Sequence, residues 1–501
     1  MNLAALASGH HPEGRAVWDG QRFTTWGELR RRAAAAAFGL RELGVAPGDR
    51  VALVWPSGVD FVVAYLAVLG VGAVAVPLNP ASPSAELERE LAAVDPVGVL
   101  ADPAGADAVG LLKAASVGVR FVVLGRGSTV PSWEDLSAPA KLHFEPVERG
   151  RHDPAVLLFT SGTAGEAKPA VLTHGNLLAN LRQMGSVPGE RIEPRDIGFT
   201  SIPLFHVFGL NVVLGVALAT GLPLVLEERF CPQASLQLVR DLAVTLVVGA
   251  PPTFQGWLAL PEADAPARSF AGVRRAVSGA AALAPEVAMD FEARFGVPLA
   301  QGYGLTEAGP VVSTTVGTGR NRPGSVGRPL PGVQVRLVDT SGGDALQGDP
   351  GEIWVHGDNV FPGYWQDPQA TAEVLAGGWL RTGDVAVVSD DGDLFLVDRT
   401  KDLIIVSGFN VFPAEVERCL AEHPDVAEAA VRGVPDPTTG EAVEAVVVAR
   451  SGRRPDGTAL VEHCRARLAH YKCPSRIRFT DRLPRNVAGK ALRRALDDRA
   501  W

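Results

Sequence analysis

The chain has 501 residues, a formal net charge of −9 and 47% hydrophobic residues. A chain of this length is expected to form two to four domains with large buried cores. The acidic balance and the absence of a basic stripe disfavour nucleic acid as the partner. The cysteines lack metal-ligand spacing and indicate reduced thiols of a cytosolic protein: Cys231, Cys419, Cys464 and Cys473.

Two apolar segments, residues 61–78 and 207–226, could be mistaken for membrane spans. Glycine and turn residues interrupt both, so a buried helix followed by a buried strand explains each better. No basic region precedes the short apolar run at the N-terminus, which disfavours a signal peptide. We expect no transmembrane span and a cytoplasmic location, either free or peripheral to a membrane.

The first hundred residues alternate between helices and short apolar strands. A capping box, Thr25 with Glu28, opens an alanine-rich helix within residues 24–44. Strands are expected at 51–55, 73–77 and 97–101, with helices at 61–69 and from Ser82. This alternation predicts parallel strands with helices on the faces of the sheet.

An apolar strand at 156–159 then runs into a loop rich in hydroxyls and glycines, and a helix is expected to start at Thr173. Small residues let backbone N–H groups approach anionic oxygens, and a lysine adds a compact charge. The loop therefore suits phosphates, although it has no Walker A pattern; a flexible surface turn is the alternative. Its candidate residues are Thr160, Ser161, Gly162, Thr163, Gly165 and Lys168.

The α/β pattern continues to about residue 312, with strands expected near Ile202 and at 224–226, 246–248 and 273–277. Short strands between glycine and proline turns at 324–397 then predict a small β-barrel or meander. A compact α+β segment follows Arg399. It is expected to contain helices from Ala414 and Leu460 and strands at 426–431 and 443–448.

Lysine is scarce: only six of the 47 basic residues are lysines. Because arginine serves wherever either cation will do, a retained lysine hints that a compact ammonium on a flexible stem is required. The six are Lys113, Lys141, Lys168, Lys401, Lys472 and Lys490.

Residues 301–307 bring an aromatic ring, a hydroxyl and a carboxylate together. The face of Tyr303 could stack on a purine, and Glu307 beside Thr306 could hold Mg²⁺ against phosphate oxygens. Alone, the segment reads as a strand that ends in a turn. Five motifs in this order give the chain a resemblance to the adenylate-forming superfamily of acyl-CoA synthetases, peptide-synthetase adenylation domains and luciferases: 157–176, 301–307, 378–384, 398–402 and 484–490.

The resemblance covers residues 20–497 and implies an α/β fold. The N-terminal domain, 1–399, would bind AMP and consist of two α/β layered subdomains and a small β-barrel. A small, mobile α+β domain, 400–501, would carry the catalytic lysine. The implied ligands are ATP, Mg²⁺, coenzyme A and a small carboxylic acid, and no oligomeric state is implied.

The resemblance also assigns roles to residues. The loop from Thr160 to Lys168 would bind the β- and γ-phosphates, and Lys490 would bridge the attacking carboxylate and the phosphate, where a cation offsets charge developing in the transition state. Thr306 and Glu307 would contact the α-phosphate and Mg²⁺, which with Lys490 and His206 makes the catalytic set. Gly279, Ala280, Ala281, Gly302, Tyr303 and Gly304 would hold the adenine, and Asp384 and Arg399 the ribose.

Further roles concern the thiol and acyl sites. Lys401 would be the hinge, and Ser407, Gly408 and Phe409 would line the coenzyme A tunnel. The acyl pocket would involve His206, Phe208, Leu210 and Gly304. Taken singly, Asp384 or Gly408 could be a turn residue, Arg399 a surface ion-pair partner and His206 a core histidine.

The phosphate loop departs from the usual family pattern at Ala164, Ala167, Pro169 and Ala170. Ala164 lacks the hydroxyl usual at this position. Pro169 fixes φ and removes an N–H beside Lys168. We expect these departures to alter ATP affinity or loop mobility.

The resemblance therefore predicts an AMP-forming acid–CoA ligase: a carboxylate and ATP give acyl-AMP and pyrophosphate, and coenzyme A then gives the thioester and AMP. Amino-acid-activating domains carry an aspartate after the phenylalanine of their Phe-Asp motif, whereas here His206 follows Phe205. The expected substrate is a medium- or long-chain fatty acid or another apolar acid. The alternatives are an adenylating enzyme that delivers its acyl group to a carrier protein or to oxygen, and a nucleotide-binding homologue without turnover.

Overall fold

The structure is a computed structural model, and the chain divides into two compact units. One unit comprises residues 1–335 and 355–380, and the other comprises 336–354 and 381–501. Each unit has a hydrophobic core of its own. The structure describes residues 1–102, 119–124, 132–138, 143–160, 167–188, 191–318, 322–399, 404–406, 409–411, 413–436, 440–468, 470–485 and 496.

The first sheet of the larger unit is parallel except at one edge, where β8 runs antiparallel to β7. In sheet order its strands are β6 (Phe121–Leu124), β5 (Gly98–Ala101), β3 (Arg50–Val54), β4 (Val74–Leu78), β7 (Pro154–Thr160) and β8 (Lys168–Thr173). The helices of this part are η1 (Leu3–Gly9), α1 (Trp26–Glu42), α2 (Val59–Gly70), α3 (Ser84–Val94), α5 (Trp133–Leu136) and α6 (His174–Gly185).

The second sheet of this unit also has a parallel centre, from β1 to β13, with antiparallel neighbours at both ends. Its strands follow the order β2 (Phe23–Thr25), β1 (Arg15–Trp18), β10 (Leu224–Leu226), β9 (Gly198–Thr200), β11 (Leu246–Gly249), β12 (Arg275–Ser278), β13 (Leu299–Gly304), β14 (Val311–Thr314) and β15 (Ser325–Pro329).

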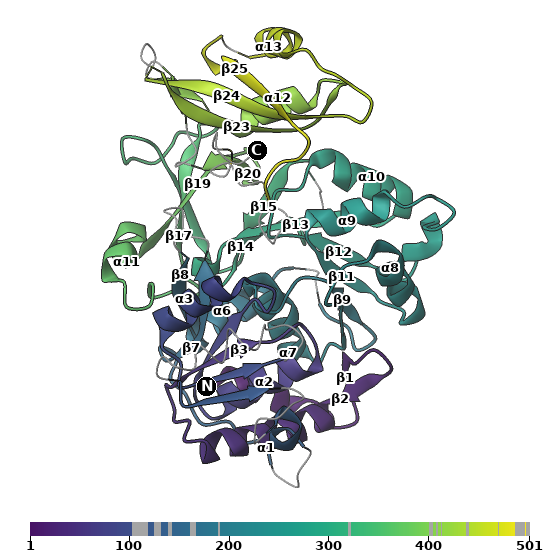
Figure 1. Ribbon diagram of the computed structural model, residues 1–501, viewed down its shortest axis with the longest axis vertical. Coiled ribbons are helices and arrows are strands. Elements are labelled where there is room, and N and C mark those ends of the chain that lie inside the picture. Colours follow the sequence, from purple (N-terminus) through teal and green to yellow (C-terminus); the bar gives the residue numbers. More distant parts are fainter. Residues whose placement is uncertain are drawn as a thin grey trace. The chain divides into compact units, whose positions relative to one another are not determined.

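Helices α8, α9 and α10 lie beside β11, β12 and β13 (Figure 1). Trp257 of α9 is fully buried at the centre of an aromatic core with Phe254, Phe270 and Phe291. The remaining helices of this unit, and one short strand, are η2 (Phe208–Gly215, a π-helix), α7 (Val216–Thr220), α8 (Pro232–Asp241), α9 (Pro251–Leu258), η3 (Ala267–Phe270), α10 (Pro285–Phe295), η4 (Thr306–Ala308), α11 (Pro368–Val374) and β18 (Leu375–Ala376).

The smaller unit contains the meander β16-β17-β19-β20 and a separate sheet in which β22, β21, β24 and β23 are antiparallel neighbours and β25 pairs parallel to β24. Helices α12 and α13 pack on one face of this sheet over a core that includes Val416 and Leu460. The bounds are β16 (Gln334–Val338), β17 (Gly351–His356), β19 (Trp379–Val388), β20 (Leu394–Arg399), β21 (Ile404–Val406), β22 (Phe409–Val411), α12 (Pro413–Ala421), β23 (Val426–Asp436), β24 (Gly440–Ala449), α13 (Gly457–Arg465), η6 (His470–Lys472) and β25 (Arg476–Thr480).

The α/β class and most expected elements are confirmed. Thr25 accepts from the Glu28 N–H while Glu28 accepts from the Thr25 N–H, so the predicted capping box is formed. Ile202 is an exception, because the strand expected there ends at Thr200. Residues 207–226 form buried helix and then strand, as expected.

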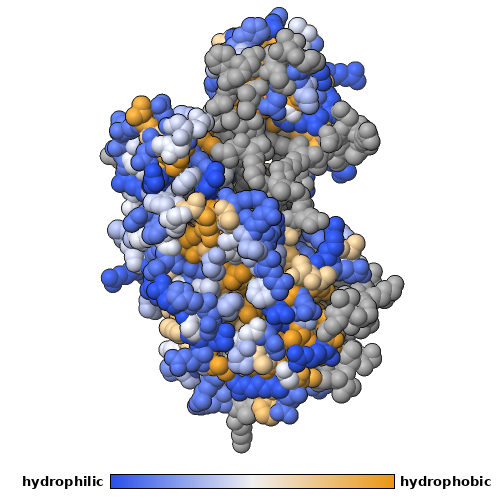
Figure 2. Space-filling model, turned by 90° about the vertical axis from the view of Figure 1, so that its left-hand side faces the viewer, coloured by the Kyte–Doolittle hydropathy of each residue, from blue (hydrophilic) through white to orange (hydrophobic). Residues whose placement is uncertain are grey.

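None of the helices in the described ranges has the length and apolar character needed to cross a bilayer. Figure 2 shows hydrophilic residues over much of one face, with hydrophobic residues in small groups between them. The free cysteines agree with the expectation of reduced thiols.

Candidate active site

The phosphate loop is the turn of an antiparallel hairpin. Thr160, the last residue of β7, is the register partner of Lys168, the first residue of β8. The Thr160 hydroxyl donates to the Lys168 carbonyl over 3.4 Å. Thr173 then caps α6 by accepting from the N–H of Asn176. The hairpin thus fixes both ends of the expected loop, while Ser161, Gly162, Thr163 and Gly165 lie outside the described residues.

The side chain of Lys168 contacts a segment that is distant in the sequence. Its Nζ lies 3.1 Å from Oδ2 of Asp367 and 5.9 Å from the centroid of the Tyr364 ring. Two backbone bonds join this segment to β8: Trp365 donates to the Pro169 carbonyl (2.8 Å) and Val171 to the Gly363 carbonyl (3.0 Å). Pro169, a departure from the family pattern, is therefore buried where its carbonyl holds this segment.

Glu307 lies in the short helix η4 and accepts a hydrogen bond from Tyr364. The distance from Tyr364 Oη to Glu307 Oε1 is 2.7 Å. Burial and the adjacent Glu307 carboxylate raise the pKa of Tyr364, so its hydroxyl remains a donor. The Phe361 N–H donates to the Glu307 carbonyl (2.9 Å), so the same segment holds backbone and side chain. Tyr364 thereby links the carboxylate to the lysine of the phosphate hairpin.

The expected adenine residues lie at or next to the carboxyl ends of β12 and β13, neighbours at the centre of the second sheet. This edge of a parallel sheet is where ligands bind in open α/β folds. Ser278 is buried, and its hydroxyl oxygen has no hydrogen-bond partner among the described residues. Ala280 has a φ of +66°, a strained conformation for alanine of the kind found at functional sites. Tyr303 is buried in β13.

Gly304 is required by the backbone. A Cβ at this position would lie 1.9 Å from the Pro310 carbonyl oxygen, and the register of β13 with β14 shifts here. Any side chain would force the strands apart, so the turn that leads to Thr306 and Glu307 needs glycine.

His206 precedes the π-helix η2. The Phe208 N–H donates to its Nδ1 (3.2 Å), so the proton of the neutral ring lies on Nε2. Burial lowers the pKa of His206 to about 4, and the ring is therefore neutral at pH 7. Phe208 and Leu210 are buried, and a Cβ on Gly279 would lie 2.7 Å from the Phe208 ring. The structure thus brings Phe208 against the expected adenine segment.

The two expected ribose residues belong to the smaller unit. Asp384 in β19 and Arg399 in β20 are register partners. Asp384 is buried, and its N–H donates to the Thr382 hydroxyl over 3.1 Å. The neighbouring Gly383 N–H donates to Glu352 (3.1 Å). The side chains of Arg399 and Phe409 are not described, and Lys401, Ser407, Gly408 and Lys490 lie outside the described residues.

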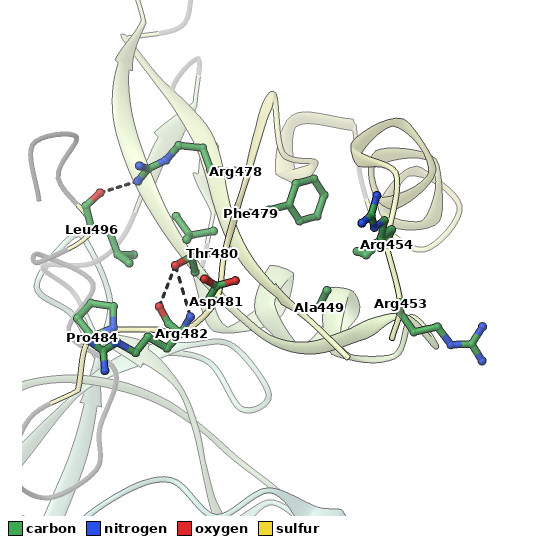
Figure 3. Close-up of a pocket in the computed structure, with 12 residues that line it drawn as sticks. Ala449, Arg453, Arg454, Arg478, Phe479, Thr480, Asp481, Arg482, Pro484 and Leu496 are labelled. Atoms are coloured by element: carbon green, nitrogen blue, oxygen red, sulfur yellow. Dashed lines mark hydrogen bonds between the residues drawn. The ribbon is translucent and has the colours of Figure 1, made fainter. Parts of the chain in front are cut away.

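The smaller unit also contains a cavity of about 550 Å³ against β24 and β25 (Figure 3). Arginines line it, but Arg478 donates to the Leu496 carbonyl over 2.6 Å, and Arg453 points to the opposite side from Arg482. Because the guanidinium groups do not converge, this cavity is not a built phosphate site.

The Glu307 carboxylate and the neighbouring Thr306 hydroxyl suit a magnesium ion. Mg²⁺ prefers oxygen ligands and is often held by one or two carboxylates together with substrate phosphates. In the described ranges no group of three or more His, Cys, Asp or Glu side chains could hold a metal by itself. Glu307 and Thr306 could hold the ion only together with nucleotide oxygens.

Comparisons with known proteins decide the family. Residues 5–365 match the family described as AMP-binding enzyme, and residues 415–490 match the AMP-binding enzyme C-terminal domain. The chain belongs to the AMP-binding enzyme family, in its acyl-CoA synthetase branch. This agrees with the resemblance carried by the five motifs, and the enzyme is an AMP-forming acid–CoA ligase.

The similar proteins are named for different substrate acids. A feruloyl-CoA synthase from Amycolatopsis sp is 39% identical, with 96% of this chain and 95% of that protein covered. A long-chain-fatty-acid–CoA ligase from Yersinia pestis is 36% identical, with 95% and 89% covered. ATP-bound MatB from Rhodopseudomonas palustris superposes with a TM-score of 0.92 at 33% identity, with 99% and 98% covered.

Tyr364 and Asp367 were not expected from the sequence, because each acts through a partner far along the chain. Two weak signals existed. Tyr364 is one of only four tyrosines. Asp367 precedes Pro368 and caps α11 by accepting from the Ala370 N–H, a recognisable helix start.

Proposed function

We propose that this ligase activates an apolar monocarboxylic acid, fatty or aromatic, with Mg·ATP and transfers the acyl group to coenzyme A. The observation that carries the proposal is the cluster of Lys168, Tyr364 and Glu307, in which the cation of the β7–β8 hairpin and the carboxylate of η4 lie at the same tyrosine. The lysine ammonium can bind phosphate oxygens directly, and the glutamate carboxylate can bind them through a metal ion.

In the first half-reaction, a carboxylate oxygen attacks the α-phosphorus of ATP and pyrophosphate leaves. Lys168 would hold the outer phosphates, and Thr306 and Glu307 would lie beside the α-phosphate. Bound magnesium would supply positive charge against the phosphate oxygens. Lys490 would approach the two reacting anions and reduce their repulsion.

The proposed substrate follows from what lies near His206. Phe208 and Leu210 are buried apolar side chains, and His206 is neutral at pH 7. The segments 208–212, 248–252 and 280–283 contain no lysine or arginine. A second carboxylate would lack a counter-charge from these residues, which disfavours dicarboxylic acids.

In the second half-reaction the coenzyme A thiol attacks the acyl-adenylate and AMP leaves. We place the thiol approach at Ser407, Gly408 and Phe409 and the hinge at Lys401, with the mobile domain at 400–501. The proposal includes rotation of that domain between the half-reactions, which withdraws Lys490 from the adenylation site.

A panel of acids tests this function. The enzyme is incubated with ATP, Mg²⁺ and octanoate, palmitate, ferulate, benzoate or malonate, with and without coenzyme A, and AMP and thioester are quantified. We expect thioester with at least one apolar acid and none with malonate. Adenylate without thioester would instead favour delivery to a carrier protein, and no AMP with any acid would contradict the proposal.

A further inference from the structure

Tyr364 lies between two parts of the proposed nucleotide site. Its hydroxyl donates to Glu307 Oε1 over 2.7 Å, while the Nζ of Lys168 lies 5.9 Å from its ring centroid. Lys168 begins β8 of the first sheet, whereas Glu307 lies in η4, which follows β13 of the second sheet. One side chain is therefore bonded to one of the two groups that would meet the phosphates and lies close to the other.

The backbone around Tyr364 is held as firmly as its side chain. Tyr364 bridges to Ala170 of β8, and its N–H donates to Thr371 (3.0 Å). Its ring packs edge-on against Phe361, with centroids 5.0 Å apart. A donor fixed in this way favours one orientation of the carboxylate that accepts from it before a metal arrives.

We propose that Tyr364 is a positioning residue that orients the Glu307 carboxylate for the metal ion of Mg·ATP. This inference rests on the proposed function. The tyrosine does not touch the reacting atoms. It acts through Glu307, as hydrogen-bond partners of metal ligands do in other proteins.

Asp367 lies in the same segment but touches a different group. Its carboxylate pairs with Lys168 at 3.1 Å and also caps α11. The Ala370 N–H and then Lys168 lower the pKa of Asp367, so it is ionised at neutral pH. Asp367 therefore contacts the lysine and not Glu307. A substitution of Asp367 thus separates an effect on Lys168 from an effect on the proposed metal ligand.

The test uses Tyr364→Phe, which removes the hydroxyl and keeps the ring. Magnesium is titrated by calorimetry into full-length enzyme with α,β-methylene-ATP, a non-reactive analogue, and the half-saturating concentration is measured. We expect it to rise by about tenfold, the lower end of the usual effect of such partners. Turnover should fall at low magnesium and recover at high magnesium.

Two variants serve as controls. Tyr65→Phe removes a hydroxyl from a fully buried tyrosine in α2 and should leave the magnesium dependence unchanged. Asp367→Asn keeps a capping side chain, weakens the pair with Lys168 and should leave half-saturation by magnesium within about twofold of the parent.

The inference is overturned if Tyr364→Phe has the magnesium half-saturation of the parent, or if its turnover falls equally at all magnesium concentrations. A folding defect would appear as a lowered melting temperature without nucleotide. If the parent binds the analogue but makes no AMP, the proposed function fails while the metal-binding result still decides the role of Tyr364. If the parent binds no analogue, both fail.

Discussion

Asp384 and Arg399 stand opposite each other as register partners in the antiparallel pair β19–β20. They are 15 residues apart, and the turn at 390–393 folds one strand back on the other. Their backbones are thus held at one level of a meander. A carboxylate only accepts and a guanidinium only donates, a combination of residue types that suits a cis-diol, which does both.

Asp384→Asn should therefore lower the preference for ATP over 2′-deoxy-ATP. A hydrogen bond to a charged group contributes about 1.5–3 kcal/mol, so we expect a tenfold or larger loss in kcat/KM with ATP. The loss with 2′-deoxy-ATP should be much smaller, because that nucleotide lacks one hydroxyl. Kinetics with both nucleotides measure the difference.

The matched control is Asp391→Asn, an exposed aspartate of the adjoining turn. It should change neither nucleotide's kcat/KM. Equal losses with ATP and 2′-deoxy-ATP in Asp384→Asn would contradict ribose recognition and indicate a structural role.

Lys490→Ala should separate the two half-reactions. The variant should lose adenylation, because no other cation is proposed between the carboxylate and the phosphate, and should still convert pre-made acyl-AMP and coenzyme A to thioester. Both rates are measured by single-turnover experiments. Arg454→Ala, an exposed residue of the smaller unit, is the control. Loss of both half-reactions in Lys490→Ala would rule out the two-conformation mechanism.

The local signals in the sequence predicted the elements well, since capping and hydrophobic periodicity act over a few residues. Thr25 begins a helix, as the capping box with Glu28 indicates, and the helix expected to start at Thr173 is also present. The strand before the phosphate loop was also expected, but its antiparallel pairing with β8 was not, since the alternation of strands and helices predicted parallel neighbours.

The sequence did not predict the tertiary contacts of the site. Tyr364 is separated from Glu307 by 57 residues, and Asp367 is further still from Lys168. Neither pair leaves a periodic pattern. The segment that carries both residues is added to the site by backbone bonds to β8, which no local propensity encodes. Similarly, the lowered pKa of His206 depends on burial by segments that sequence proximity does not reveal.

The aromatic core gives a test of stability. Trp257 Nε1 donates to the Ser235 hydroxyl over 3.0 Å inside a fully buried region. Ser235→Ala leaves that N–H unpaired, which should lower the free energy of unfolding by about 1–3 kcal/mol. Ser269→Ala is the control, because the Ser269 hydroxyl is buried in the same unit without a partner among the described residues. Denaturant unfolding should find Ser269→Ala neutral or stabilising, and equal losses would contradict the assignment.

Glu227 follows β10 at the carboxyl edge of the second sheet, and burial raises its pKa from 4.5 to about 7. The folded chain therefore binds more protons at this group than the unfolded chain between pH 4.5 and 7. The contribution of Glu227 to stability therefore falls as pH rises through this range, and it is lost above pH 7. Glu227→Gln removes the ionisation and keeps an acceptor, so its melting temperature should match the parent near pH 4.5 and exceed it at pH 8.

The neighbouring Glu228 is exposed, so Glu228→Gln lacks the burial that drives this effect. Its difference from the parent should be small and should not grow from pH 4.5 to pH 8. Melting curves of the parent, Glu227→Gln and Glu228→Gln across that pH range measure these differences. A constant offset for Glu227→Gln would mean that its carboxylate is as well solvated in the folded chain as in the unfolded one, which contradicts the burial of Oε2 without a hydrogen-bond partner among the described residues.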